Sequence, residues 1–206
     1  MFNTQTYKQS YFLWLLALLA FLLLFRLGAT PIYILDEAKN AECAREMMQR
    51  NDLIVPTFNG ELRTDKPPLH YFFMMAAYKI FGTTEFAARF FSAIMGLLTV
   101  LVTYQYTKRL FSTFAAFCTA VVLVCSTHFL FEFRLSVPDP YLIFFITLGL
   151  FSAFTWLQEN NNAQLYIAAA SLGLATLAKG PVALALPGLC VLIWVMLSKK
   201  WKTVFT

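Results

Sequence analysis

The chain has 206 residues, of which 59% are hydrophobic and only 13% are charged, and its formal net charge is +5. Its mean hydropathy of +0.64 excludes an ordinary soluble domain. The positive charge does not indicate nucleic-acid binding, because much of the basic excess lies near the ends of apolar segments instead of on one exposed face, as in Lys108-Arg109. Such flanking charges are typical of membrane proteins.

Six apolar segments approach the length of about 20 residues that crosses the hydrocarbon core of a bilayer. With six spans, Lys108-Arg109 and the basic cluster Lys199–Lys202 fall on the same side of the membrane, as the positive-inside tendency favours. We therefore predict an all-α, polytopic transmembrane helical bundle that forms one domain over residues 1–206. The expected spans are about 11–28, 86–107, 112–131, 140–157, 164–179 and 181–198.

A long polar loop, residues 30–82, follows the first predicted span and carries many of the charges. We expect a short helix over Asp36–Arg50, with Asp36 as its N-cap, because alanine residues recur there at helical spacing. The turn signal Asn59-Gly60 predicts extended chain over Glu61–Lys66. The apolar run Leu69–Phe81 is too short to span a bilayer, so we expect a second interfacial helix there.

Several charged residues of this loop are candidates for chemistry. Asp36 and Glu37 form a carboxylate pair that can act as a general base or bind a metal, and the alternative is a helix cap beside a surface acid. Lys66 precedes two prolines and suits an anionic phosphate, although lysine at a membrane surface also snorkels to the headgroups. Arg63 and Arg134 leave the same two interpretations open.

Two further candidates follow the third and fifth predicted spans. Asp139 lies between two prolines at the start of the fourth span, where it suits either an N-cap or a functional acid. Lys179 precedes Gly180-Pro181, for which a hairpin turn with a snorkelling lysine is the favoured interpretation. Glu132 is expected to pair with Arg134 or to line a cavity. The six-span arrangement places Asp139 and Lys179 on the same side as Asp36 and Lys66.

The sequence has no glycine-rich nucleotide loop and no hydrolase or zinc-protease motif. His70 and His128 lack the spacing of a metal-ligand pair. An enzyme driven by ATP or by a nucleotide sugar is therefore not indicated, and a lipid-borne substrate fits better.

An ordered series of short motifs resembles the N-terminal half of a family of membrane glycosyltransferases. This family is the superfamily of aminoarabinose transferases and dolichyl-phosphate-mannose protein mannosyltransferases, which have the GT-C fold. The resemblance runs from about Leu35 to Pro187. The motifs are Leu35-Asp36-Glu37-Ala38, Ala44-Arg45-Glu46-Met47, Phe58-Asn59-Gly60-Glu61, Asp65-Lys66-Pro67-Pro68-Leu69, Arg89-Phe90-Phe91-Ser92 and Ala178-Lys179-Gly180-Pro181.

The resemblance implies an enzyme that takes a sugar from a polyprenyl-phosphate carrier and passes it to a lipid A-like lipid or a protein. It implies a bacterial inner membrane, with the site on the periplasmic face. Asp36 matches the essential carboxylate of the family, Asp139 a second acid, and Lys66 a lysine near the carrier phosphate. Glu37, Arg63, Arg134 and Lys179 are the further expected substrate-binding residues.

No cofactor is firmly implied by the resemblance. The aminoarabinose branch usually has Glu where Asp65 stands, and a divalent metal is associated with that position. Asp65 is therefore the candidate metal ligand.

Length is the main departure from the family, whose members continue with more spans. We therefore consider a truncated product, or half of a split enzyme completed by a second chain. Two rival functions remain: a module that binds or transports a lipid phosphate without chemistry, and a structural subunit. A transporter needs ionisable residues within its spans, and the spans predicted here are nearly free of them.

Overall fold

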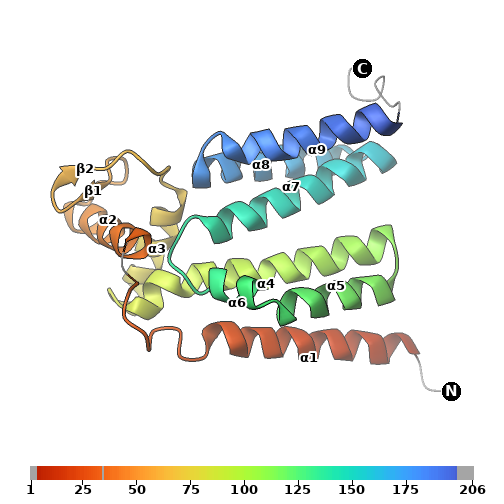
Figure 1. The fold of residues 1–206 in the computed structure, drawn as a ribbon, viewed down its shortest axis with the longest axis horizontal. Coiled ribbons are helices and arrows are strands. Elements are labelled where there is room, and N and C mark those ends of the chain that lie inside the picture. Colours follow the sequence, from red (N-terminus) through yellow and green to blue (C-terminus); the bar gives the residue numbers. More distant parts are fainter. Residues whose placement is uncertain (1–3, 34, 199–206) are drawn as a thin grey trace.

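The structure is a computed structural model that describes residues 4–33 and 35–198. It confirms the all-α prediction, and the only strands in these ranges form one short hairpin (Figure 1). The basic cluster Lys199–Lys202 lies outside the described residues. The helices are α1 Thr4–Leu24, α2 Asp36–Arg50, α3 Leu69–Phe81, α4 Glu85–Leu110, α5 Thr113–Cys125, α6 Thr127–Glu132, α7 Asp139–Glu159, α8 Asn162–Lys179 and α9 Val182–Ser198; the strands are β1 Thr57–Phe58 and β2 Glu61–Leu62.

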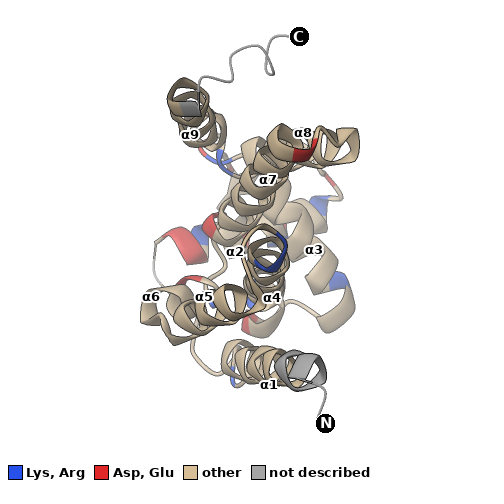
Figure 2. Ribbon diagram, turned by 90° about the vertical axis from the view of Figure 1, so that its right-hand side faces the viewer, with Lys and Arg blue, Asp and Glu red and all other residues tan. Residues whose placement is uncertain are grey.

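Six of the helices run side by side along the long axis: α1, α4, α5, α7, α8 and α9 (Figure 1). Viewed along that axis, α1 and α9 lie at opposite edges and most of the ribbon carries no charged residue (Figure 2). Among the described residues, α4 and α7 are long and apolar enough to cross a membrane, and the apolar stretches Ser10–Leu24, Thr113–Cys125 and Val182–Leu197 are shorter. Helices α2 and α3 and the hairpin gather at one end of the bundle.

Two predicted spans differ from the observed helices. The first helix ends at Leu24 instead of continuing to residue 28, and a turn with Arg26 at φ 52° follows it. The third predicted span is interrupted at Ser126, which has extended backbone angles. The Ser126 hydroxyl accepts a hydrogen bond from the Phe129 amide at 3.4 Å and so begins the separate helix α6. Serine favours such a cap because its side chain competes for backbone partners.

The main core fixes the chain that follows α6. Phe133 is fully buried, and it packs against Gly96 of α4 and Leu23 of α1. A Cβ at Gly96 would lie 2.8 Å from Cγ of Phe133 and 3.0 Å from Cδ1 of Leu23, so only glycine permits this approach. The loop between α6 and α7 is thereby held against α1 and α4.

A smaller core attaches α2 to α3. Cys43 and Met47 of α2 pack with Tyr71 and Met74 of α3, and all four are fully buried. The hairpin is joined to α2 through Glu46, whose carboxylate accepts hydrogen bonds from the Thr57 hydroxyl and from the Gly60 amide (3.3 Å).

The hairpin turn has the predicted form. Asn59 and Gly60 both have positive φ, 54° and 81°, as a two-residue hairpin turn requires. Regular strand is confined to Thr57–Phe58 and Glu61–Leu62, so the extended segment predicted over Glu61–Lys66 is confirmed only at its start.

Candidate functional site

Asp36 and Lys66 lie together although 30 residues separate them. The Lys66 ammonium is 3.4 Å from Oδ2 of Asp36, and the two side chains are 19% and 62% exposed. The predicted N-cap role of Asp36 is wrong: the N-cap is Leu35, and Asp36 is the first residue of α2. Its carboxylate faces Lys66 instead of capping backbone amides. Pro67 restricts the Lys66 backbone, which helps to fix the position of the ammonium.

A second acid–lysine pair joins α7 to α8. Asp139 is the first residue of α7, with Pro138 as the N-cap, so of its two interpretations the N-cap is wrong. Its carboxylate instead forms an ion pair with the ammonium of Lys179, the last residue of α8. Both side chains are about one third exposed, at 33% and 35%. Lys179 therefore has a specific partner within the protein, Asp139, instead of reaching to the lipid headgroups.

The two pairs lie at the same end of the bundle, as the sequence predicts. The start of α2, the start of α7 and the end of α8 are all found at the left of Figure 1. Two contacts link α2 to the loop before α7: the Asn40 amide donates to the Ser136 carbonyl at 3.3 Å, and the Ser136 amide donates to Glu37 at 2.9 Å. Asp36 therefore lies at the start of α2 and Asp139 directly follows the loop before α7, and these two segments are hydrogen-bonded to each other.

Glu37 occupies a different environment from the one expected. It is 2% exposed, and its carboxylate forms an ion pair with Arg89, which is 3% exposed. Burial opposes the charge of Glu37, but hydrogen bonds from Arg89 and from the amides of Tyr33 and Ser136, with the Arg89 charge, hold its pKa below the usual value. Glu37 therefore faces protein groups instead of an open site.

Arg89 was expected only as part of the motif Arg89-Phe90-Phe91-Ser92. The only available signal was an arginine at the start of an apolar span, where a buried charge requires a partner.

Arg63 and Asp65 form a separate pair. Nε of Arg63 donates to Oδ1 of Asp65 at 2.7 Å, and Nη1 lies 3.4 Å from the Cys43 sulfur. Burial opposes the charge of Asp65, and the hydrogen bond and charge of Arg63 hold its pKa below the usual value. No group of three or more His, Cys, Asp or Glu side chains that could hold a metal ion occurs among the described residues. A lone carboxylate engaged with arginine does not fit a divalent metal.

Arg134 binds the end of α1. Its guanidinium donates to the carbonyls of Leu22, Leu23 (3.3 Å) and Phe25 (3.1 Å). A cation there satisfies carbonyls that the helix leaves free and interacts favourably with the helix dipole. The expected pairing with Glu132 is therefore replaced by a cap on α1.

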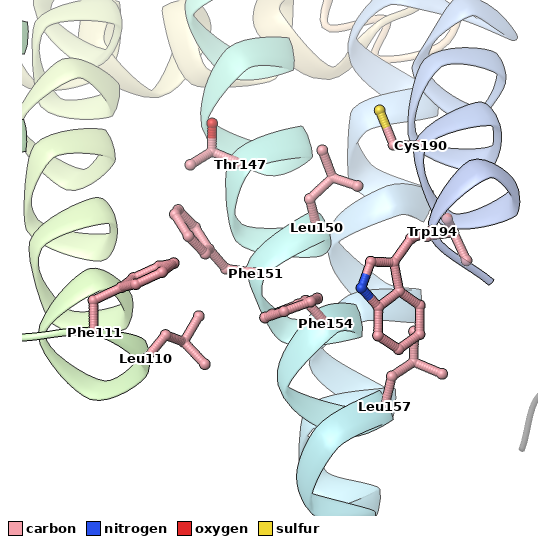
Figure 3. Close-up of a pocket in the computed structure, with 10 residues that line it drawn as sticks. Leu110, Phe111, Thr147, Leu150, Phe151, Phe154, Leu157, Cys190 and Trp194 are labelled. Atoms are coloured by element: carbon pink, nitrogen blue, oxygen red, sulfur yellow. The ribbon is translucent and has the colours of Figure 1, made fainter. Parts of the chain in front are cut away.

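A large apolar pocket lies away from these charges. It has a volume of about 500 Å³ and is lined by residues of α4, α7 and α9 with Phe111 (Figure 3). Leu110 and Phe111, at the end of α4, place it toward the opposite end of the bundle. The lining contains no charged side chain, so it offers nothing to a phosphate.

Comparison with known proteins decides the family. Residues 65–206 match the model of the dolichyl-phosphate-mannose-protein mannosyltransferase family. The chain belongs to this family. The resemblance to membrane glycosyltransferases of the GT-C fold is thereby confirmed, and with the apolar helices α4 and α7 it identifies an integral membrane protein.

The named relatives are bacterial transferases. An undecaprenyl phosphate-alpha-4-amino-4-deoxy-L-arabinose arabinosyl transferase 2 of Sodalis glossinidius is 31% identical over 93% of this chain and 36% of its own length. The corresponding transferase of Edwardsiella ictaluri is 29% identical over 82% of this chain and 32% of its own length.

Solved structures share the fold. ArnT from Cupriavidus metallidurans in the apo state superimposes with a TM-score of 0.87 at 24% identity, over 94% of this chain and 37% of that chain. The same protein bound to undecaprenyl phosphate gives the same TM-score. The chain therefore spans about a third of the length of these relatives. Because they carry the additional length in one chain, the comparisons give no support to a second chain.

Proposed function

We propose that this chain forms the reactive end of a membrane glycosyltransferase that moves a sugar from a polyprenyl-phosphate carrier to an acceptor. The observation that carries the proposal is the pair of Asp–Lys contacts, Asp36–Lys66 and Asp139–Lys179, at one end of an apolar helical bundle. Support comes from the relatives, which are named as transferases of an undecaprenyl-phosphate-linked sugar, and from a similar fold with undecaprenyl phosphate bound.

Lys66 is the proposed phosphate ligand. Its side chain is partly exposed and its ammonium contacts the mostly exposed carboxylate of Asp36, so a lipid phosphate can replace Asp36 as its partner. A cation fixed there stabilises the charge that develops on the phosphate as the sugar leaves. A phosphate departs readily, so the reaction needs no acid to protonate it.

Asp36 is the proposed general base. Its carboxylate is mostly exposed and lies next to the proposed phosphate position, where an acceptor hydroxyl approaches the anomeric carbon. Asp139 and Lys179, at the same end of the bundle, are assigned to the acceptor: Asp139 orients it and Lys179 binds its anionic part. The remaining candidates Glu37, Arg63 and Arg134 hold the surrounding segments, as their protein contacts describe.

We further propose that the bundle crosses a bacterial inner membrane six times, with α5 and α6 together forming the third span. In this arrangement the charged end lies on the periplasmic face and Lys108-Arg109 lies on the cytoplasmic side. The acceptor is then a lipid such as lipid A, or a protein, that reaches the same face. Its recognition involves an exposed hydroxyl or phosphate close to Asp139.

The proposal is tested with purified chain in lipid nanodiscs and a labelled undecaprenyl-phosphate sugar. Asp36→Asn removes the base and is expected to abolish turnover while retaining carrier binding. Lys66→Ala is expected to weaken carrier binding. Glu61→Gln and Lys79→Ala are matched controls, since both side chains lie in the same loop and outside the proposed site.

Carrier binding without turnover in the wild type would support the rival binding module. Equal turnover in the wild type and Asp36→Asn would refute the role of Asp36.

A further inference from the structure

The carboxylate of Glu37 connects three separate segments. Its two oxygens accept hydrogen bonds from Nε (2.7 Å) and Nη2 (2.8 Å) of Arg89 in α4. They also accept from the backbone amide of Tyr33 at 2.6 Å and from that of Ser136 at 2.9 Å. The chain before α2, the start of α4 and the loop before α7 therefore meet at one buried carboxylate.

Arg89 encloses the connection between α1 and α2 from the other side. Its Nη1 donates to the Leu27 carbonyl (3.0 Å), to the Thr30 carbonyl (2.8 Å) and to the Thr30 hydroxyl (3.0 Å), while Nη2 donates to the Pro31 carbonyl (2.9 Å). All three guanidinium nitrogens are engaged. Lysine has a single point charge and cannot reproduce this planar set of donors.

These contacts lie directly beside the proposed acids. Asp36 precedes Glu37 in the chain, and Leu35 before it has φ 80° and ψ −114°, a conformation that a non-glycine residue adopts only when its surroundings impose it. On the other side, Ser136 is bonded through both of its backbone groups, by Glu37 and by Asn40, and Asp139 follows three residues later.

We infer that the Glu37–Arg89 pair is a positioning device, which sets Asp36 and Asp139 relative to each other by holding the start of α2 against the loop before α7. The inference deepens the proposed function and rests on it. Neither residue touches the substrates, because both are buried and bonded to protein groups. Their effect reaches the reaction through the geometry of the two acids, and a small misplacement of a catalytic group lowers the rate steeply.

The test compares changes in this pair with changes in a matched ion pair. Glu37→Gln keeps the shape but leaves one oxygen to accept four hydrogen bonds, and Glu37→Asp keeps the charge but shortens the reach. Arg89→Lys keeps the charge and loses the planar donors. Arg109→Lys and Glu159→Gln are the controls, because that exposed pair (Nε–Oε1 2.9 Å) joins α4 to α7 at the opposite end.

The first measurement is the steady-state kinetics of sugar transfer in nanodiscs, at a temperature where each variant is folded. All three variants of the pair are expected to lower kcat at least about tenfold. Their KM for the carrier-linked sugar should stay within about twofold, because Lys66 still binds the phosphate. A purely structural role of the pair would not lower kcat while leaving KM unchanged. Full rescue of kcat by Glu37→Asp, or a change confined to KM, would overturn the inference.

The second measurement is hydrogen exchange in the same samples, which needs no activity. Glu37→Gln is expected to raise amide exchange at least about tenfold both near Tyr33 and in the loop that contains Ser136, whereas the control variants leave both segments unchanged. Unchanged exchange around Ser136 would overturn the inference. If the wild type does not transfer sugar, the proposed function fails, and the exchange result still decides whether Glu37 couples the two segments.

Discussion

Gly96 offers a direct test of how the bundle holds the loop before α7. Gly96→Ala adds a Cβ at 2.8 Å from Phe133 and 3.0 Å from Leu23, and both side chains are fully buried. Gly173→Ala, in α8, adds the same atom where nothing lies within 4 Å. The two substitutions change helix propensity alike and differ in the contact that they create.

Overpacking a tight core of this kind costs about 1–3 kcal/mol. For a chain of this length the corresponding loss in Tm is about 2–12 °C. Gly149→Ala should lie between the two, because its added Cβ meets Cδ2 of Leu172 at 3.0 Å, and that flexible side chain can move. Thermal unfolding in detergent, followed by circular dichroism, gives the order of the three variants.

The expected order of Tm is Gly173→Ala highest, then Gly149→Ala, then Gly96→Ala. A Gly96→Ala variant as stable as Gly173→Ala would refute the reasoning, since it would mean that α4 and the chain at Phe133 do not approach as closely as described. Because Phe133 anchors the loop that carries Asp139, Gly96→Ala is also expected to reduce sugar transfer, whereas Gly173→Ala leaves it unchanged.

Three further predictions concern charged and buried groups near the site. The pKa of Glu37 is lower in the folded chain than in the unfolded chain, so its stabilising contribution is present above the unfolded value of about 4.5 and is lost as pH falls through the folded value. Glu37→Gln should therefore flatten the dependence of Tm on pH in this acidic range. An unchanged dependence of Tm on pH would contradict the assignment. Burial, with the charge of Arg63, lowers the pKa of His70 to about 3, so its ring should remain neutral at pH 5 by nitrogen NMR, and stability should fall as pH drops from about 6.5 toward 3, where only the unfolded chain binds the proton. Arg134→Ala should lower stability by about 1–2 kcal/mol and increase hydrogen exchange at the end of α1, whose carbonyls it caps; exchange that rises only elsewhere would argue against this contact.

The sequence alone determined the fold class and predicted that Asp36, Lys66, Asp139 and Lys179 lie at the same end of the bundle. Long apolar segments can satisfy their backbone groups in a membrane only as helices, so the helices α4, α7, α8 and α9 follow closely from the hydropathy pattern. Helical spacing predicted α2, and an apolar run too short to span a bilayer predicted α3. The hairpin turn at Asn59-Gly60 followed from its residue types, because both positions require positive φ.

Only the tertiary structure decided the partners of the charged residues. Asp36 meets Lys66 across 30 residues, Asp139 meets Lys179 across 40, and Glu37 meets Arg89 across 52. Local rules predicted a helix cap for Asp36 and offered one as an alternative for Asp139, because an acid at a helix start normally accepts backbone amides. A lysine brought close by packing competes for the same carboxylate, and no local pattern contains that information. How the helices pack therefore decides which acids are open to a substrate and which are bonded to other protein groups.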